Sequence, residues 1–152
     1  MRMLGLLLVA GLISSCASSP ADPSLDAAAK LFRAPTDKAC IYVVPSSSDE
    51  AVTVTLDGRK MATLGERDFL CLDIAPGRHV LYVTPTSLVP EFLRATGDDV
   101  TLEAEAGRCY FLRTVWTEFG RSWRRPRVYL ERTTEEEGRR AVNVRSLVVP
   151  AR

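Results

Sequence analysis

The chain has 152 residues, 46% of them hydrophobic and 26% charged, with 20 Lys and Arg residues against 19 Asp and Glu residues. These proportions are typical of one ordinary globular domain, and they exclude a collagen-like, disordered or multi-span membrane protein. Because the charges balance, the chain lacks the strongly basic surface that general nucleic-acid binding needs, and we expect no nucleic-acid partner.

Residues 1–15 have the pattern of an export signal. Arg2 precedes an apolar run over residues 4–13, about half the length of a membrane-spanning helix. The run ends in Ile13-Ser14-Ser15-Cys16, which resembles the bacterial lipobox. That resemblance implies cleavage before Cys16 and attachment of acyl chains, palmitate among them, because one chain alone anchors a protein only marginally. An ordinary cleaved signal with an incidental cysteine is the alternative.

The residues after Cys16 bear on its destination. Ala17, rather than aspartate, follows the cysteine, which by the sorting rule of Gram-negative lipoproteins implies the outer membrane. We therefore expect a lipid-anchored protein of the cell envelope that faces the periplasm. Residues 16–37 are rich in Ser, Pro, Ala and Asp and lack a sustained apolar period, which predicts a flexible tether.

From residue 38 onward, short β-type runs are separated by turn signals. Val52–Leu56 alternates apolar and hydroxyl side chains, and Asp57-Gly58 predicts a tight turn to a returning strand at residues 61–64. Residues 70–74 and 79–83 predict a second antiparallel pair around Pro76-Gly77. Further strands are expected at residues 41–44, 100–102, 109–116 and 128–130.

These runs predict one all-β domain over residues 38–152, an antiparallel β-sandwich of about seven to eight strands. No helix-length amphipathic segment interrupts the runs. Residues 135–140 are more polar and suit one helical turn, and residues 142–149 suit an edge strand or a packed C-terminal arm. The sequence contains no internal repeat and no sign of a second domain.

Four segments that follow the lipobox resemble, taken together, the pattern of a known protein family. Their order and spacing are similar to those of the small bacterial lipoproteins grouped as domain of unknown function 2846, whose β-rich unit resembles the PEGA-type surface modules. The similarity spans residues 38–141; it implies a β-rich fold and a location in the envelope, and it brings no catalytic residues to this sequence. Cys71 and Cys109 depart from the family pattern. The four segments are Cys40–Val44, Val54–Gly58, Leu72–His79 and Glu105–Arg113.

Cys40, Cys71 and Cys109 all lie in or beside predicted strands. An exported protein meets an oxidising compartment, in which paired cysteines are usual. We expect a disulfide between Cys71 and either Cys40 or Cys109, with three buried free thiols as the alternative. A zinc site built from these thiolates and His79 is not favoured, because no Cys-x-x-Cys spacing is present, and we expect no metal or cofactor.

His79 is the single histidine of the chain, so Ser-His-Asp or Cys-His chemistry would have to use it. It follows a Pro-Gly turn within a predicted strand, where a sheet-surface or hydrogen-bonded buried histidine is the usual case. We therefore expect no enzymatic activity. A small periplasmic hydrolase or thiol-redox protein that uses His79 or the thiols is the alternative function.

The most distinctive segment lies between two predicted strands and carries two tryptophans and four arginines. The arginines suit phosphates or carboxylates, and the tryptophans supply flat apolar contacts. The alternative is a solvated loop whose aromatics fold back on to the core under arginine stems. We expect a non-enzymatic binding or structural module that contacts the membrane through its lipid and, through this segment, an envelope protein or an anionic envelope polymer. The candidate binding residues are Trp116, Arg121, Trp123, Arg124, Arg125 and Arg127.

Overall fold

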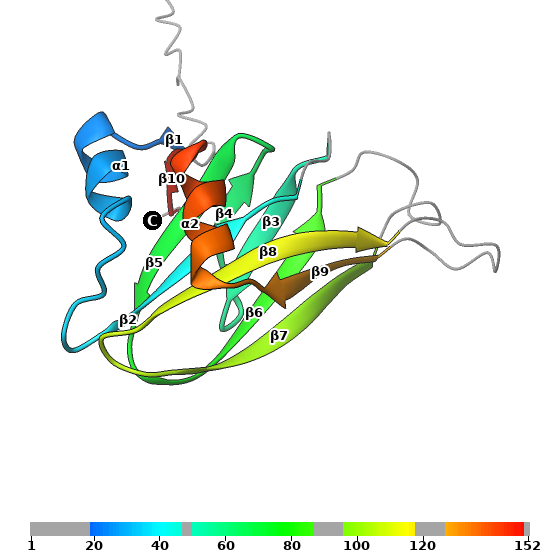
Figure 1. Ribbon diagram of the computed structural model, residues 1–152. Helices are drawn as coiled ribbons and strands as arrows, with labels where there is room; N and C mark the ends of the chain where they lie inside the picture. The colour runs from blue at the N-terminus through cyan, green and yellow to red at the C-terminus, as the bar shows by residue number, and fades with distance from the viewer. Residues whose placement is uncertain (1–18, 47–49, 87–95, 118–126, 151–152) are drawn as a thin grey trace, which may run out of the picture.

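The computed structural model describes residues 19–46, 50–86, 96–117 and 127–150 (Figure 1). These residues form ten strands and two helices. The strands are β1 (Ser19–Pro20), β2 (Ala39–Val44), β3 (Val52–Leu56), β4 (Arg59–Leu64), β5 (Asp68–Ile74), β6 (Gly77–Pro85), β7 (Thr96–Ala104), β8 (Cys109–Thr117), β9 (Arg127–Arg132) and β10 (Ser146–Val149). The helices are α1 (Pro23–Ala29) and α2 (Glu135–Asn143).

All ten strands belong to one mixed sheet, in the order β1-β10-β5-β2-β8-β9-β7-β6-β3-β4. Three neighbouring pairs are parallel, namely β10 with β5, β2 with β8, and β7 with β9. The sheet curls, so that β4 at one edge comes close to β5 and β10 near the other edge. The all-β class is thus confirmed, and each of the eight expected strands lies within an observed one. The strands form a single curled sheet, however, and not the antiparallel sandwich of seven to eight strands that we expected.

The two predicted antiparallel pairs have opposite outcomes. Asp57 and Gly58 have φ angles of 48° and 80°, as a two-residue hairpin turn requires, and β3 pairs with β4 as predicted. The pair around Pro76-Gly77 is wrong, because β5 pairs with β2 and β10 while β6 pairs with β3 and β7. Both edges of β5 are already occupied by other strands. At this turn the chain therefore crosses the sheet, from β5 beside β2 and β10 to β6 beside β3 and β7.

The concave side of the sheet encloses the main hydrophobic core. Strands β2 to β10 all contribute alternate side chains to it, as the pleat of a strand requires. Thr114 is the one buried polar residue of the described chain, and its hydroxyl accepts a hydrogen bond from the Ser46 amide at 2.8 Å. Members of this core include Ile41, Leu64, Leu70, Leu81 and Leu112.

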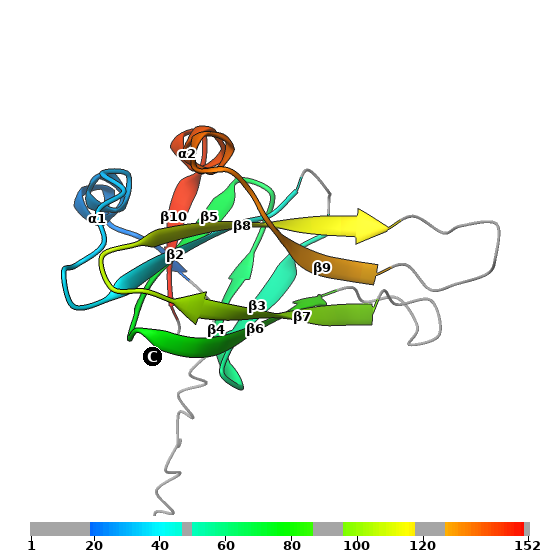
Figure 2. The same ribbon diagram turned by 60° about the horizontal axis from the view of Figure 1, so that its bottom comes forward.

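Both helices lie on the convex side of the sheet, over β2, β5, β8 and β10 (Figure 2). A second hydrophobic cluster fills the space between the helices and these strands. Its centre is aromatic: the rings of Tyr42 and Phe111 stack with their centroids 5.0 Å apart, and Phe32 lies 5.3 Å from Tyr42. The strands beneath the helices are therefore covered on both faces.

Helix α2 is longer than the single turn predicted for residues 135–140. Thr134 forms its N-terminal cap, with the Thr134 hydroxyl accepting from the Glu137 amide and the Glu137 carboxylate accepting from the Thr134 amide. Gly138 lies directly on Phe111, and a Cβ atom at that position would stand 2.4 Å from the phenyl ring. The missing side chain is what allows the helix to approach the sheet.

The chain after α2 joins the sheet as β10, which lies between β1 and β5. A strand is thus confirmed for residues 146–149, but it is not the edge strand that we predicted, and residues 142–143 belong to α2. Arg145 holds this junction by donating to three carbonyl oxygens: Ala141 at 2.7 Å, Glu66 at 3.1 Å and Pro45 at 3.2 Å. The end of α2 is thereby tied to the turn before β5 and to the end of β2.

Residues 19–37 pack on the sheet and are not the free tether that we expected. Ser19 pairs with Val149, which adds β1 beside β10. Asp26 of α1 accepts a hydrogen bond from the Leu147 amide at 2.8 Å and forms an ion pair with Lys30 at 2.7 Å. The folded unit thus begins by residue 19, and the boundary at residue 38 is corrected. Composition indicated a tether because no residue of α1 is fully buried, so the helix leaves no sustained apolar period in the sequence.

Candidate functional site

The segment that we predicted to bind a partner is described only at its two ends. Arg121, Trp123, Arg124 and Arg125 lie outside the described residues, as does the proposed lipidation site, Cys16. Trp116 packs against the main core. At the other end, the Arg127 guanidinium pairs with Asp98, and the Arg127 amide donates to the Thr117 hydroxyl at 2.8 Å.

The three cysteines of the domain do not pair as predicted. Cys40 and Cys109 form the disulfide, across the parallel pair β2 and β8, where their Cα atoms lie 4.6 Å apart. Cys71 is a free thiol. The prediction that Cys71 takes part was wrong because β5 lies on the other side of β2, where Cys71 faces Tyr42 in the ladder and Cys40 faces Asp73.

Cys71 is a poor nucleophile where it lies. Burial raises the pKa of its thiol to about 11, and the negative charge of Asp73 acts in the same direction, although a hydrogen bond with Tyr42 opposes the shift. Only the thiolate attacks electrophiles or disulfides, so almost all of this side chain is inactive near neutral pH. The state of Cys71 therefore does not support the thiol-redox alternative.

His79 is engaged at both ring nitrogens. Its Nδ1 lies 2.6 Å from a carboxylate oxygen of Asp57, and its Nε2 lies 2.8 Å from the carbonyl oxygen of Ala75. The hydrogen bond with Asp57 raises the pKa of His79, and the hydrogen bond with the Ala75 carbonyl raises it further. Partial burial of the ring acts in the opposite direction and lowers it. The Val80 amide and then His79 lower the pKa of Asp57. This histidine joins two turns, and each of its ring nitrogens faces an acceptor oxygen.

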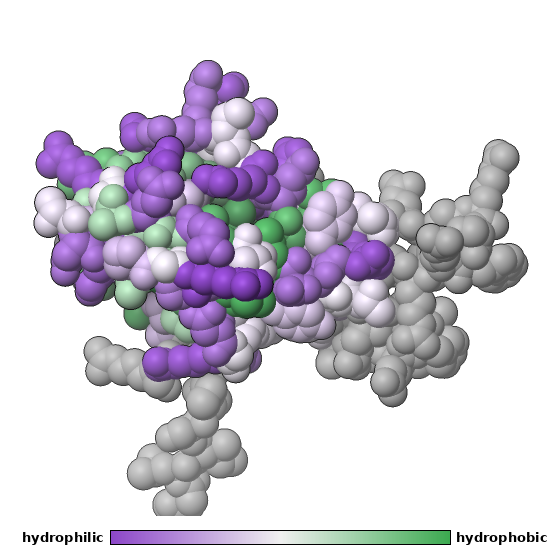
Figure 3. Space-filling model, turned by 90° about the horizontal axis from the view of Figure 1, so that it is seen from below, coloured by the Kyte–Doolittle hydropathy of each residue, from purple (hydrophilic) through white to green (hydrophobic). Residues whose placement is uncertain are grey.

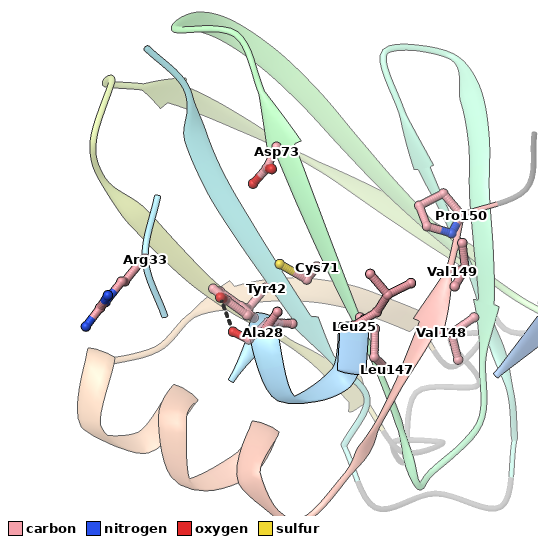
Figure 4. Close-up of a pocket in the computed structure, with 11 residues that line it drawn as sticks. Leu25, Ala28, Arg33, Tyr42, Cys71, Asp73, Leu147, Val148, Val149 and Pro150 are labelled. Atoms are coloured by element: carbon pink, nitrogen blue, oxygen red, sulfur yellow. Dashed lines mark hydrogen bonds between the residues drawn. The ribbon is translucent and has the colours of Figure 1, made fainter. Parts of the chain in front are cut away.

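A pocket of about 330 Å³ lies on the convex side of the sheet, beside α1 (Figure 4). One wall is helix α1, which contributes Leu25, Ala28 and Ala29. The opposite wall is β10 and the residue after it, so that aliphatic side chains meet across the space. The wall residues from this end are Leu147, Val148, Val149 and Pro150.

The remaining lining residues give the pocket a few polar groups. Tyr42 comes from β2, and Cys71 and Asp73 come from β5. The Tyr42 hydroxyl donates to the Ala29 carbonyl at 2.6 Å, and burial raises the pKa of this phenol, so the hydroxyl stays protonated and is already used. Figure 4 shows Asp73 and Arg33 at a distance from the aliphatic walls. The centre of the pocket is thus apolar, with charge at its periphery.

This pocket was not predicted from the sequence, although one of its walls, helix α1, has a local sequence signal. Asp22 caps α1 by accepting from the Ser24 amide at 2.8 Å, and Pro23 is its first residue. An Asp-Pro-Ser run is typical of a helix start. Nothing local indicates that α1 lies across β10, because that contact joins residues more than a hundred positions apart.

No protein-family model matches the sequence, and no curated protein matches it. Within the part of the chain that the structure describes, neither helix is both long and apolar enough to cross a membrane. The same residues contain no group of three His, Cys, Asp or Glu side chains that is placed to hold a metal ion.

Proposed function

We propose that this protein is a lipoprotein of the cell envelope, anchored through acyl chains on Cys16, whose domain serves as a non-enzymatic binding or structural module. The observation that carries the proposal is the Cys40–Cys109 disulfide. Structural disulfides persist in oxidising compartments and are rare in the cytosol, so the pair supports export of the chain. The Ile13-Ser14-Ser15-Cys16 motif supports lipidation as the outcome of export.

The non-enzymatic character is supported by the two groups best suited to chemistry. His79 has both ring nitrogens in hydrogen bonds, and Cys71 has a raised pKa. We also propose that the domain resembles the small lipoproteins of domain of unknown function 2846 and resides at the outer membrane. In this proposal the arginines of the segment from Trp116 to Arg127 contact an envelope protein or an anionic polymer, and the lipid provides the membrane contact.

The lipidation is tested by feeding cells a fatty acid that carries an alkyne and detecting its incorporation. We expect the wild type to carry the label and to sediment with membranes, and Cys16→Ser to lose both properties. Cys71→Ser is the matched control, because it removes a cysteine that we do not propose to be modified. An unlabelled wild type, or an unchanged distribution of Cys16→Ser, would refute the proposal.

The partner contact is tested in the same cells by crosslinking. The double variant Arg124→Glu and Arg125→Glu reverses the charge of the segment, and we expect it to lose the wild-type crosslinked envelope product while keeping the fatty-acid label. Retention of that product would contradict the assigned role of these arginines.

A further inference from the structure

The pocket beside α1 lies next to the point at which the described chain begins. Ser19 pairs with Val149 and Pro20 pairs with Val148, and both of these β10 residues line the pocket. Only residues 17–18 separate Cys16 from β1. A chain spans at most about 3.6 Å per residue, so Cys16 stays within roughly 11 Å of Ser19. A group attached to Cys16 is therefore confined to the neighbourhood of the pocket.

The chemistry of the pocket fits a hydrocarbon chain. Its walls meet through Leu25 and Ala28 of α1 and through Leu147 and Val149 of β10. The one hydroxyl in the lining, that of Tyr42, already donates its hydrogen to a carbonyl oxygen, so a ligand need not supply an acceptor for it. A volume of about 330 Å³ is in the range of sites that take small apolar ligands.

We propose that one acyl chain carried by Cys16 occupies this pocket, so that the protein shields part of its own anchor. The inference rests on the lipidation proposed above. Burial of methylene groups supplies the driving force, as it does in a bilayer. Attachment to the same chain raises the effective concentration of the acyl chain at the pocket, which favours this occupant over a free lipid.

The short connection also limits the distance between the domain and the membrane. In this proposal, because residues 17–18 are the whole connection, the convex side, which carries α1 (Figure 2), is held close to the lipid surface. Leu25 and Leu31 are 53% and 59% exposed on this side. An acyl chain in the pocket covers Leu25 and leaves Leu31 outside, which distinguishes the two leucines experimentally.

The test uses a fatty acid with both a diazirine and an alkyne, incorporated by growing cells and activated by light before purification. We expect crosslinks within the protein, on the tryptic peptides from Asp68 to Arg78 and from Ser146 to Arg152, which carry lining residues from β5 and β10. Ala28→Trp places an indole in the pocket, and because packed interiors have little spare volume we expect it to lower the yield of these peptides about fivefold.

Leu31→Trp is the matched control, since it adds the same side chain near α1 at a residue that does not line the pocket. It should leave the crosslink yield unchanged. Retention of the Cys40–Cys109 disulfide and of the urea midpoint in both variants shows that the fold is intact. If probe is incorporated but crosslinks only to phospholipid, or if Ala28→Trp and Leu31→Trp behave alike, the pocket assignment is overturned while lipidation stands. Absence of incorporation refutes the proposed lipidation itself.

Discussion

Strands β2 and β3 both read as β structure in the sequence, yet they occupy different environments. Every residue of β2, Ala39–Val44, is buried, whereas β3, Val52–Leu56, alternates between buried and partly exposed residues. Helices α1 and α2 lie over β2 and its neighbours (Figure 2). The partly exposed residues of β3 include Thr53 and Thr55, which alternate with buried valines. A second apolar face on a strand thus reports cover by another element, as in sheets that are buried on both sides.

The two regions also differ in what holds their outer surfaces. Under the helices the contacts are aromatic, centred on Tyr42 and Phe111. On β6 the outward residues Val80 and Tyr82 are 37% and 38% exposed, and a view from below shows hydrophilic side chains over much of the surface with smaller hydrophobic areas between them (Figure 3). The covered region should therefore depend far more strongly on single outward side chains than the region of β3 and β6.

The largest expected effect is the loss of an aromatic ring beneath the helices. Phe111→Ala removes a side chain that is 4% exposed and stacks on Tyr42, and we expect the free energy of unfolding to fall by about 3–5 kcal/mol. Tyr82→Ala removes a ring from an outward position of β6 and should cost about 1 kcal/mol or less. Urea unfolding of both variants measures the difference; equal losses would mean that the helices do not create a second core.

A smaller change in the free energy of unfolding is expected where α2 meets the sheet, and its sign tests whether the two pack closely. Alanine is a better helix former than glycine by about 1 kcal/mol, so Gly138→Ala would be stabilising in an isolated helix. Here the new Cβ would lie 2.5 Å from the Cβ of Phe111, an atom fixed close to the backbone. We expect a net loss of about 1–3 kcal/mol because of this overlap.

Asn143→Ala is the control for Gly138→Ala, since it changes an exposed residue of the same helix. Its free energy of unfolding should differ from the wild type by less than about 0.5 kcal/mol. Thermal or urea unfolding of the two variants gives the comparison. A Gly138→Ala protein more stable than the wild type would show that α2 does not pack closely on Phe111.

The smallest effect concerns pH and lies away from the helices, at the turns that His79 joins. Protonated His79 can donate to Asp57 and to the Ala75 carbonyl at once, whereas the neutral ring has a single N–H. Because the pKa of His79 is raised by folding, its contribution is complete below about pH 6.5 and is lost as the pH rises through the folded pKa. The lowered pKa of Asp57 makes its contribution present above about pH 4 and lost on further acidification.

We expect the His79–Asp57 pair to contribute about 0.5 kcal/mol to the free energy of unfolding, because Asp57 is 47% exposed and solvent screens the pair. As the pH rises from about 6 to about 9, the urea midpoint of the wild type should decrease. This decrease should be smaller in His79→Gln. His79 is the only histidine, so no other imidazole contributes to the change. The same pH dependence in His79→Gln would assign the effect to other groups.

Features set by adjacent residues could be predicted from the sequence, whereas pairings between distant residues could not. The Asp57-Gly58 hairpin was predictable because two adjacent residues determine the turn. The partner of β5 was not, because Pro76-Gly77 marks a turn without specifying which strand follows alongside. The same limit explains the disulfide: Cys40 and Cys109 are 69 residues apart, and only the order of β5, β2 and β8 decides which cysteine faces Cys40.

The sequence by itself determined the all-β class, the eight main strands and the β3–β4 hairpin, because alternation of side chains and positive-φ turn residues act over a few neighbouring positions. Tertiary structure alone decided the single curled sheet, the crossing between β5 and β6, the docking of α1 on β10 and the pocket between them. Strand pairing and helix docking join residues far apart in the chain, and many arrangements bury the same apolar faces. Which one forms depends on how all the strands and helices pack at once.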